Sequence, residues 1–501
     1  MRLEFFNFYK LINCYSILFK KLLECVWELP KAVVIVLLYY LEEFMNILFI
    51  SLGCDKNLVD SEVMLGIIRD RGFLFTDNEQ DADIIIVNTC CFIHDAKEES
   101  INTILEMAEY KKTGKLKGLI VTGCLGQRYK EEIQNEIEEV DAILGTTSYD
   151  EIANVIDTVL AGNKTVQMKD LQYLTEVHAS RINTTGGYFS YLKIAEGCDK
   201  HCTYCIIPKI RGNFRSIPME KLIAQAEELV KNGARELILV AQETTLYGKD
   251  IYGEKSLHKL LKELCKIEDL QWIRLLYSYP EEITDELIEV MRTEDKICKY
   301  LDMPIQHAAD NILKKMGRRT TKAELISIIT KLRKNIPDIS LRTTLITGFP
   351  GETEEEHNEL MQFVRDMKFD RLGVFTYSKE EDTPAAKMKP QIHKHIKKKR
   401  QAEIMEIQQT IAFEHAKDMV GKKLEVMIEG KLPRDNSDYT TVLLNNTDSE
   451  VSNVYIGRTY MDAPKVDGYI FVQTRAELMS GEFVNVLVTD AKEYDLVGEL
   501  L

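Results

Sequence analysis

The chain has 501 residues, which is too long for one ordinary hydrophobic core, so about three domains are expected. Its composition, 45% hydrophobic and 29% charged, is typical of a soluble globular protein. The 64 Lys and Arg against 80 Asp and Glu give a formal net charge of −16, which argues against a protein that mainly wraps nucleic-acid phosphates and suits small molecules or a basic partner.

Residues 1–44 differ from the rest of the chain. They are rich in apolar and aromatic residues, but Glu24, Glu28, Pro30 and Lys31 interrupt any apolar run long enough to cross a bilayer. Met45 precedes a strand-like run, so we expect residues 1–44 to be an extension, such as one from an upstream start codon, that is not part of the native fold. No stable membrane association is expected.

From residue 45 onward, short β-branched runs alternate with amphipathic helical stretches. The runs at residues 47–50, 84–87 and 119–121 are typical of buried parallel strands. They predict an α/β domain with an open parallel sheet at residues 45–165. A polar stretch at residues 170–187 is typical of a linker.

Six further strand-like runs, separated by helical stretches, predict a partial (β/α)6 barrel at residues 186–418. They lie at residues 191–195, 236–241, 272–277, 300–304, 341–347 and 372–377. A basic run at residues 387–400 then enters a long polar helix, and such a run is more often a solvated face than a binding site. Residues 421–501 contain short runs at 424–429, 440–444, 469–474 and 483–488, which predict a small antiparallel β-barrel.

Three of the 11 cysteines, Cys198, Cys202 and Cys205, stand on one short loop after the first strand of the second domain. Their C-x3-C-x2-C spacing allows the three thiolates to bind one cubane iron–sulfur cluster. A bacterial ferredoxin would differ, because its motif continues with a nearby fourth cysteine followed by proline. The next cysteine is Cys265, so one iron would stay open for a substrate or cofactor. The alternative is zinc with His201 as a ligand, but zinc usually takes four ligands in two close pairs.

This loop resembles that of the radical S-adenosylmethionine superfamily. The resemblance implies that the cofactor chelates the open iron through its amino and carboxylate groups and that one electron from the reduced cluster cleaves it to a 5′-deoxyadenosyl radical. It also places Tyr204 beside the adenine. Further candidate cofactor contacts are Gln242, Glu243, Arg342 and residues 348–352. Alternatively, these residues are only the ordinary polar residues of a barrel end and a turn.

Three more cysteines, Cys54, Cys90 and Cys124, each follow a predicted strand of the first domain. Carboxyl ends of parallel strands share one edge of a sheet, so these thiols are expected to converge and hold a second cluster with one open iron. The alternative, cysteines used as small apolar core residues, does not explain why all three follow strand ends. Cys91 is the reserve ligand. The spread of the cysteines through a long α/β chain predicts reduced thiols and a cytoplasmic location.

Two such clusters in one chain resemble the methylthiotransferases. The resemblance implies an amino-terminal cluster domain, a radical barrel and a β-barrel called TRAM. It also implies an activity that converts an unactivated C–H bond into C–S–CH3. The stretches at residues 51–57, 88–93 and 241–248 resemble the branch that modifies the β-carbon of an aspartate in ribosomal protein twelve of the small subunit, although Cys91 replaces an expected glycine. The other branch, which modifies an adenosine of transfer RNA, would more typically have Gln-Met-Asn after the first cysteine.

Charge favours the protein substrate. Residues 421–501 contain eight Lys or Arg and fourteen Asp or Glu, a net charge of −6, which attracts a basic ribosomal protein and repels phosphate. Alternatively, the negative charge of residues 421–501 has no role in binding and the substrate is recognised by another part of the chain. The implied partners are an electron donor such as flavodoxin or ferredoxin and a sulfur donor, with nucleic acid contacted only if the substrate is ribosome-bound. A rival of another class is a non-catalytic iron–sulfur electron carrier or scaffold.

Overall fold

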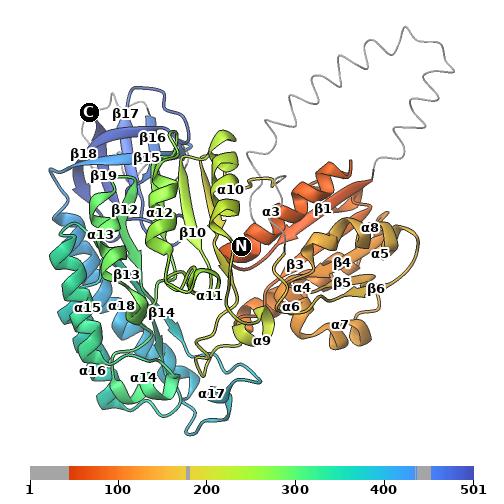
Figure 1. Ribbon diagram of the computed structural model, residues 1–501, viewed down its shortest axis with the longest axis horizontal. Coiled ribbons are helices and arrows are strands. Elements are labelled where there is room, and N and C mark those ends of the chain that lie inside the picture. The colour runs from red at the N-terminus through yellow and green to blue at the C-terminus, as the bar shows by residue number, and fades with distance from the viewer. Residues whose placement is uncertain (1–44, 176–180, 435, 437–452) are drawn as a thin grey trace. The chain divides into compact units, whose positions relative to one another are not determined.

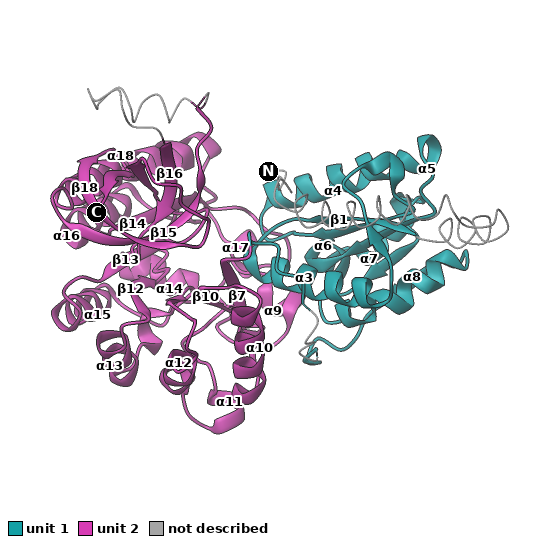
Figure 2. Cartoon of the chain, turned by 90° about the horizontal axis from the view of Figure 1, so that it is seen from above, with its two compact units in different colours: residues 1–186 teal, residues 187–501 magenta. Residues whose placement is uncertain are grey.

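The computed structural model describes residues 45–175, 181–434, 436 and 453–501 (Figure 1). The predicted extension at residues 1–44 and the predicted strand at residues 440–444 lie outside the described residues. The chain divides into two compact units, Met1–Gly186 and Gly187–Leu501 (Figure 2).

The first unit contains a parallel sheet, as predicted, and the sheet has six strands in the order β2-β1-β3-β4-β5-β6. Its strands are β1 (Asn46–Ser51), β2 (Leu74–Phe75), β3 (Ile84–Thr89), β4 (Gly118–Thr122), β5 (Ala142–Leu144) and β6 (Thr165–Gln167). The sequence revealed only β1, β3 and β4. The other three strands have two or three residues each, too few for a recognisable run.

Helices connect these strands. They are α3 (Asp55–Asp70), α4 (His94–Ala108), α5 (Tyr110–Thr113), α6 (Gly123–Arg128), α7 (Lys130–Glu136) and α8 (Ile152–Leu160). In α8, Ile152, Val155, Ile156 and Val159 recur at helical spacing and are buried in the core beside the sheet. Because α3, α4 and α6 directly follow β1, β3 and β4, the three connecting loops lie at one edge of the sheet.

The second unit begins with a six-stranded parallel sheet whose strands follow chain order, β7-β10-β11-β12-β13-β14, as expected of the predicted partial barrel. Its strands are β7 (Phe189–Lys193), β10 (Glu236–Val240), β11 (Trp272–Leu275), β12 (Ile297–Asp302), β13 (Ser340–Thr347) and β14 (Arg371–Thr376). Helices between the strands lie around the outside of the sheet (Figure 2). They include α10 (Met219–Lys231), α12 (Leu257–Cys265), α13 (Asp285–Thr293), α14 (Asp310–Met316), α15 (Lys322–Asn335) and α16 (Glu354–Met367).

The long helix α18 (Lys394–Lys417) leads into a closed five-stranded barrel with the order β15-β16-β17-β19-β18. Its strands are β15 (Lys423–Lys431), β16 (Asn453–Arg458), β17 (Ile470–Thr474), β18 (Phe483–Ala491) and β19 (Leu496–Leu500). The predicted small barrel is confirmed, but β16 and β19 had not been recognised. The pair β17 and β19 is parallel, so the barrel is not antiparallel throughout.

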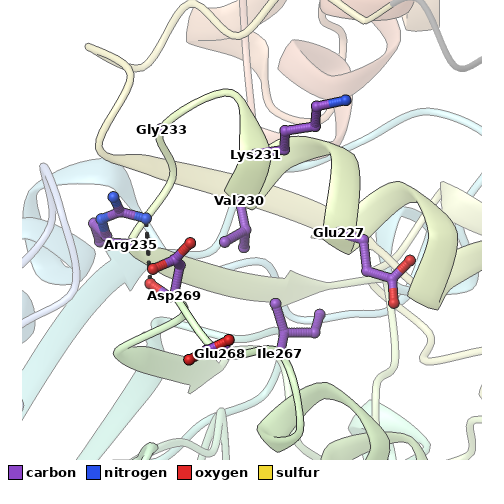
Figure 3. Close-up of a pocket in the computed structure, with 8 residues that line it drawn as sticks. All are labelled: Glu227, Val230, Lys231, Gly233, Arg235, Ile267, Glu268 and Asp269. Carbon is purple, nitrogen blue, oxygen red and sulfur yellow. Dashed lines mark hydrogen bonds between the residues drawn. The ribbon is translucent and has the colours of Figure 1, made fainter.

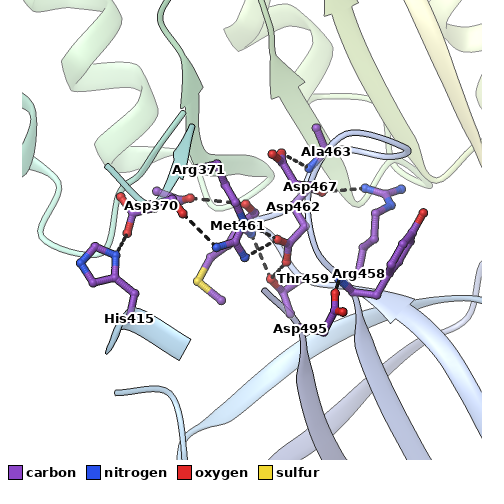
Figure 4. Close-up of polar contacts among 12 residues, drawn as sticks. Asp370, Arg371, His415, Arg458, Thr459, Met461, Asp462, Ala463, Asp467 and Asp495 are labelled. Carbon is purple, nitrogen blue, oxygen red and sulfur yellow. Dashed lines mark hydrogen bonds and ion pairs between the residues drawn. The ribbon is translucent and has the colours of Figure 1, made fainter. Parts of the chain in front are cut away.

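Buried charged side chains join this barrel to the sheet. Arg458 of β16 donates a 2.6 Å hydrogen bond to Glu236, the first residue of β10, and Arg274 of β11 donates one of 2.7 Å to the same carboxylate. Arg371, the first residue of β14, donates a 2.9 Å hydrogen bond to Asp462 in the loop after β16 (Figure 4). The barrel therefore lies against the amino-terminal ends of the strands, opposite the edge where the loop after β7 emerges.

Candidate active site

Cys198, Cys202 and Cys205 lie on a loop that follows β7 and the short strand β8 (Ala195–Glu196) and ends at helix α9 (Ile207–Arg211). The backbone turns at Gly197 with a φ of +78°. A Cβ atom at Gly197 would lie 2.0 Å from the carbonyl oxygen of Asn213, so only glycine permits this close approach.

Thr203 anchors the loop to two neighbouring segments. Its N–H donates to the Met316 carbonyl at 2.9 Å and its hydroxyl to the Lys315 carbonyl at 2.8 Å. Its own carbonyl accepts a 2.9 Å hydrogen bond from the N–H of Ala385. Helices α14 and α17 (Pro384–Lys387) therefore hold the cysteine loop in place (Figure 1).

The three thiols of this loop are largely withdrawn from solvent. Cys198 and Cys202 are buried and Cys205 is partly exposed. Burial raises the pKa of Cys198 to about 12 and also raises the pKa of Cys205, and the neighbouring Cys202 thiol contributes in both cases. The described cysteines form no disulfides. Binding of iron here would require the thiols to lose their protons.

A buried arginine that we did not identify from the sequence adjoins the loop. The Arg318 side chain is 1% exposed, and its guanidinium lies over the Tyr279 ring, 4.2 Å from the ring centroid. The Tyr279 hydroxyl lies 3.7 Å from the Cys202 sulfur. Nη2 of Arg318 donates to the Pro304 carbonyl at 3.1 Å, whereas Nε and Nη1 have no hydrogen-bond partner among the described residues. Arg318 thus adds a buried positive charge beside Cys202.

Tyr204, predicted to contact the adenine, is partly buried within the loop. Its ring packs edge-on against Phe349, with 6.5 Å between centroids. Phe349 belongs to the turn at residues 348–352, which is also a predicted cofactor contact. The structure therefore brings these two predicted elements together.

Gln242 and Glu243 follow β10 at the same edge as the cysteine loop. Gln242 Nε2 donates a 2.7 Å hydrogen bond to Glu196, which also pairs with Lys193 at 2.8 Å and Arg211 at 3.2 Å. The Gln242 side chain is thereby fixed by β8. Its oxygen is buried and has no hydrogen-bond partner among the described residues.

Glu243 is fully buried, and burial raises the pKa of its carboxyl to about 7. One carboxyl oxygen accepts from the N–H of Thr245 at 3.0 Å, and Lys200 lies 3.8 Å from the other. That second oxygen lacks a hydrogen bond within the described part of the chain. Buried oxygens without a hydrogen bond on both Gln242 and Glu243 suit a polar ligand at the end of β10.

Arg342, the fourth predicted cofactor contact, has other partners. It forms ion pairs with Asp302 at 2.8 Å and with Asp467, in the loop between β16 and β17, at 3.3 Å. These contacts link it to the carboxyl-terminal barrel. Its contact with a cofactor stays a prediction.

In the first unit, two asparagines tie together the loops that carry the other three cysteines. Asn57 at the start of α3 donates to the carbonyls of Leu52 and Thr89 at 2.8 and 3.0 Å. Asn88 donates to the Asn57 carbonyl at 3.0 Å, and the Thr89 hydroxyl donates to the Thr122 carbonyl at 2.5 Å. These bonds join the ends of β1, β3 and β4.

Cys54, Cys90 and Cys124 lie at these joined strand ends. Cys54 is exposed, and Cys90 and Cys124 are buried. Gly53 approaches Cys90 so closely, with a φ of +91°, that an added Cβ atom would lie 3.0 Å from the Cys90 sulfur. Cys91, the reserve ligand, is fully buried; burial and the neighbouring Cys124 raise the pKa of its thiol.

The donor chemistry of both sets fits iron–sulfur clusters. Among the described residues, no group of three or more His, Cys, Asp or Glu side chains is placed to hold one metal ion. An iron–sulfur cluster spreads its cysteine ligands over several irons, so the thiols need not converge on one point. Loops rich in buried thiols at strand ends suit such a group.

A pocket of about 310 Å3 lies elsewhere in the second unit, beside Arg235, which directly precedes β10 (Figure 3). It is lined by Glu227, Val230, Lys231, Gly233, Arg235, Ile267, Glu268 and Asp269. The pocket is therefore at the amino-terminal edge of the sheet, remote from the cysteine loop. Within the residues described, no helix is long and apolar enough to span a membrane.

Three parts of the chain match known families. Residues 46–145 match the Uncharacterized protein family UPF0004, residues 192–364 the Radical SAM superfamily and residues 420–501 the TRAM domain. The chain is 69% identical over 454 residues to the ribosomal protein uS12 methylthiotransferase RimO of Lachnoclostridium phytofermentans, covering 91% of this chain and 99% of that protein. It is 48% identical to the protein of the same name from Clostridioides difficile, covering 90% and 98%.

Among solved structures, the fold is similar to that of the radical S-adenosylmethionine methyltransferase TsrM from Kitasatospora setae. The TM-score is 0.51 at 12% sequence identity, and the match covers 76% of this chain and 78% of that one. At this identity the likeness shows a shared fold alone.

Proposed function

The chain belongs to the ribosomal protein uS12 methylthiotransferase family, and from this premise we propose that it attaches a methylthio group to the β-carbon of an aspartate in uS12. The observation that carries the proposal is the 69% identity over 91% of the chain to a relative of that name. Iron–sulfur and S-adenosylmethionine chemistry follow from the Radical SAM match.

We assign Cys198, Cys202 and Cys205 as ligands of one 4Fe-4S cluster. With S-adenosylmethionine bound, that cluster would supply the radical that removes hydrogen from an unactivated carbon. The protein's own contribution is to hold the three thiols on a loop fixed by Gly197 and Thr203. It also withdraws them from water, which protects a reactive intermediate from side reactions.

We assign Cys54, Cys90 and Cys124 as ligands of a second 4Fe-4S cluster that supports sulfur insertion. Support comes from the hydrogen bonds of Asn57 and Asn88, which join the three strand ends. Cys91 is buried beside Cys90 and Cys124 and is the alternative ligand.

We propose that Tyr204, Gln242 and Glu243 bind S-adenosylmethionine. The buried oxygens of Gln242 and Glu243 that lack a hydrogen bond suit the amino group of the cofactor, and Tyr204 offers an aromatic surface for its adenine. Arg342 is the least supported of the predicted contacts, because Asp302 and Asp467 already engage it.

We propose three domains, a cluster domain at residues 45–165, a radical core at 186–418 and a TRAM domain at 421–501, with residues 1–44 as an extension. The acidic TRAM domain would attract the basic ribosomal substrate. A cytoplasmic location follows from a ribosomal substrate, and an electron donor and a sulfur donor complete the partners.

The test is mass spectrometry of uS12 from a strain that lacks the gene and is complemented with variants. Wild type should restore a methylthiolated aspartate, whereas Cys198→Ala and Cys54→Ala should not. Cys298→Ala, which changes a buried cysteine in β12, should retain modification if the protein folds. Methylthiolated uS12 from the Cys54 variant would disprove the second cluster assignment.

Two readouts separate the rival functions. If deletion of the gene removes methylthiolated adenosine from bulk transfer RNA and leaves uS12 unaffected, the substrate is transfer RNA and not uS12. Purified protein with reconstituted clusters, reduced by dithionite, should form 5′-deoxyadenosine from S-adenosylmethionine in wild type and the Cys54 variant but not in the Cys198 variant. None above background in any variant would favour an electron carrier or scaffold.

A further inference from the structure

The surface around the cysteine loop is basic in a chain that is acidic overall. Residues 383–400 contain six Lys and one Arg but no Asp or Glu, whereas the whole chain has a net charge of −16. We define the basic rim as the exposed residues Lys314, Arg319, Lys387, Lys389, Lys394 and Lys398. None of the six forms an ion pair with another residue that the structure describes.

Hydrogen bonds connect the rim to the cysteine loop. Thr203 binds the backbone of Lys315 and Met316 in α14 and that of Ala385 in α17, so Lys314 and Lys387 lie on helices in contact with the loop. Lys315 in turn donates to the Gly351 carbonyl at 3.3 Å. The N–H of Gly351 donates to the Pro390 carbonyl at 2.9 Å, which places Lys389 in the same surface.

Two carboxylates near the start of α18 pair with residues outside the rim. Glu354 pairs with Arg400 at 3.3 Å, and Glu403 pairs with Lys399 at 3.5 Å and with His357 at 3.0 Å. The six rim side chains therefore present their positive charge to solvent without an ion-pair partner among the described residues.

The charges of α18 oppose helix stability. Lys394 is its first residue, and its first turn contains no acidic residue, although the helix dipole favours negative charge there. Lys394 and Lys398 are also like charges four residues apart on one helix face. Residues that break local rules of stability without a visible structural gain are commonly functional.

We propose that the basic rim is the docking surface for an acidic protein that delivers single electrons to the cluster of Cys198, Cys202 and Cys205. The inference rests on the proposed function, in which that cluster must be reduced by one electron while the donor is oxidised by one. Contact with the cysteine loop decides between partners: an electron donor must bind close to the cluster, whereas ribosomal RNA need not. Complementary charge would also accelerate encounter with the donor.

The test compares two triple variants of the full chain with reconstituted clusters. The rim variant carries Lys389→Glu, Lys394→Glu and Lys398→Glu. The matched control carries Lys221→Glu, Lys231→Glu and Lys334→Glu, three exposed lysines on α10 and α15. The probe is an acidic flavodoxin in its fully reduced form, and dithionite is the small reductant that needs no docking surface.

Two quantities are measured at low and at high salt. The first is the Kd for flavodoxin, by calorimetry. The second is the rate of cluster reduction by flavodoxin, by stopped-flow absorbance, divided by the rate of reduction by dithionite in the same variant. We expect the rim variant to lose about tenfold in affinity and normalised rate at low salt, a loss that shrinks at high salt, and the control to stay within about twofold of wild type. Equal loss in both variants, or none in the rim variant, overturns the proposal.

A third measurement, the Kd for an RNA duplex of mixed sequence, covers the competing partner. A rim variant that loses RNA affinity but keeps flavodoxin binding and reduction would show a nucleic-acid surface and overturn the proposal. Failure of dithionite to reduce a cluster in wild type would instead refute the proposed function.

Discussion

Arg458 in β16 and Glu236 in β10 form a fully buried ion pair of 2.6 Å between residues 222 positions apart in the chain. Arg274, also fully buried, donates to the same carboxylate at 2.7 Å. Glu429 accepts a further hydrogen bond from Arg458 at 2.5 Å. The two arginines and the two glutamates at the junction of barrel and sheet thus carry equal and opposite charge.

Removing one member of this network should destabilise the second unit. Arg458→Met leaves Glu236 with Arg274 alone and Glu429 without its partner, and loss of one side of a buried pair costs about 3–5 kcal/mol. Trp272 reports on the junction, because its ring packs edge-on against Phe483 at 4.8 Å. Urea unfolding is followed by Trp272 fluorescence in a Trp27→Phe background. We expect the free energy of unfolding of Arg458→Met to be lower than that of wild type by this amount.

The matched control is Lys266→Met, which removes an exposed ion pair with Glu263. Such pairs contribute about 0–1 kcal/mol, so this variant should unfold close to wild type. An equal, small effect in both variants would show that the buried network contributes little to stability.

Sequence patterns predicted the parallel sheets because buried β-branched runs and their helical neighbours are local features. The Arg458–Glu236 pair could not be predicted, since nothing local distinguishes those two residues from the other 142 charged residues of the chain. Strands such as β5 and β6, with three residues each, are defined by pairing with neighbours and not by their own sequence.

The same limit applies to the site. Cysteine spacing is local, so the loop with Cys198 and the strand-end position of Cys90 could be recognised. Arg318 could not be separated from Arg319 by sequence, because only the tertiary structure buries one and exposes the other. Asn57 likewise acts through backbone groups of distant strands.

The Glu352 carboxyl should make the free energy of unfolding depend on pH. Burial alone would raise the pKa of Glu352, but the adjacent His307 and His357 rings, 3.9 and 3.6 Å from its Oε1, and the nearby charge of Arg400 lower it to about 2 from an ordinary 4.5. A lowered pKa in the folded state gives stability that is present above pH 4.5 and is lost as pH falls towards 2. The Glu352→Gln variant should therefore be less stable than wild type at pH 7 by on the order of 3 kcal/mol.

Urea unfolding followed by circular dichroism at pH 7, 5, 4 and 3 measures this difference, which should shrink with each step below pH 5. The comparison variant Glu406→Gln changes an exposed residue of α18 and should show little difference from wild type at any pH. A destabilisation by Glu352→Gln that stays constant down to pH 3 would contradict the assigned role of its charge.

Arg318 should raise the reduction potential of the cluster assigned to Cys202. Its buried positive charge favours the reduced, more negative state, and charge and hydrogen bonding are known determinants of cluster potential. In Arg318→Gln we expect the midpoint potential, measured by electron paramagnetic resonance during redox titration, to fall by about 60 mV, a tenfold change in the one-electron equilibrium. Arg319→Gln, which changes the exposed neighbour, should leave the potential near that of wild type.

Gly197 and Gly253 have the same φ of +78° but different surroundings, which makes them a matched pair. Gly253→Ala meets nothing within 4 Å and should cost only the left-handed conformation, about 1–2 kcal/mol. Gly197→Ala would also force Cβ to within 2.0 Å of the Asn213 carbonyl oxygen, so the cysteine loop must move. After anaerobic reconstitution we expect Gly197→Ala to lose the iron of one cluster, about half of the total if the chain holds two, while Gly253→Ala keeps the full amount. Full iron content in both variants would mean that the loop can bind its cluster without the Gly197 turn.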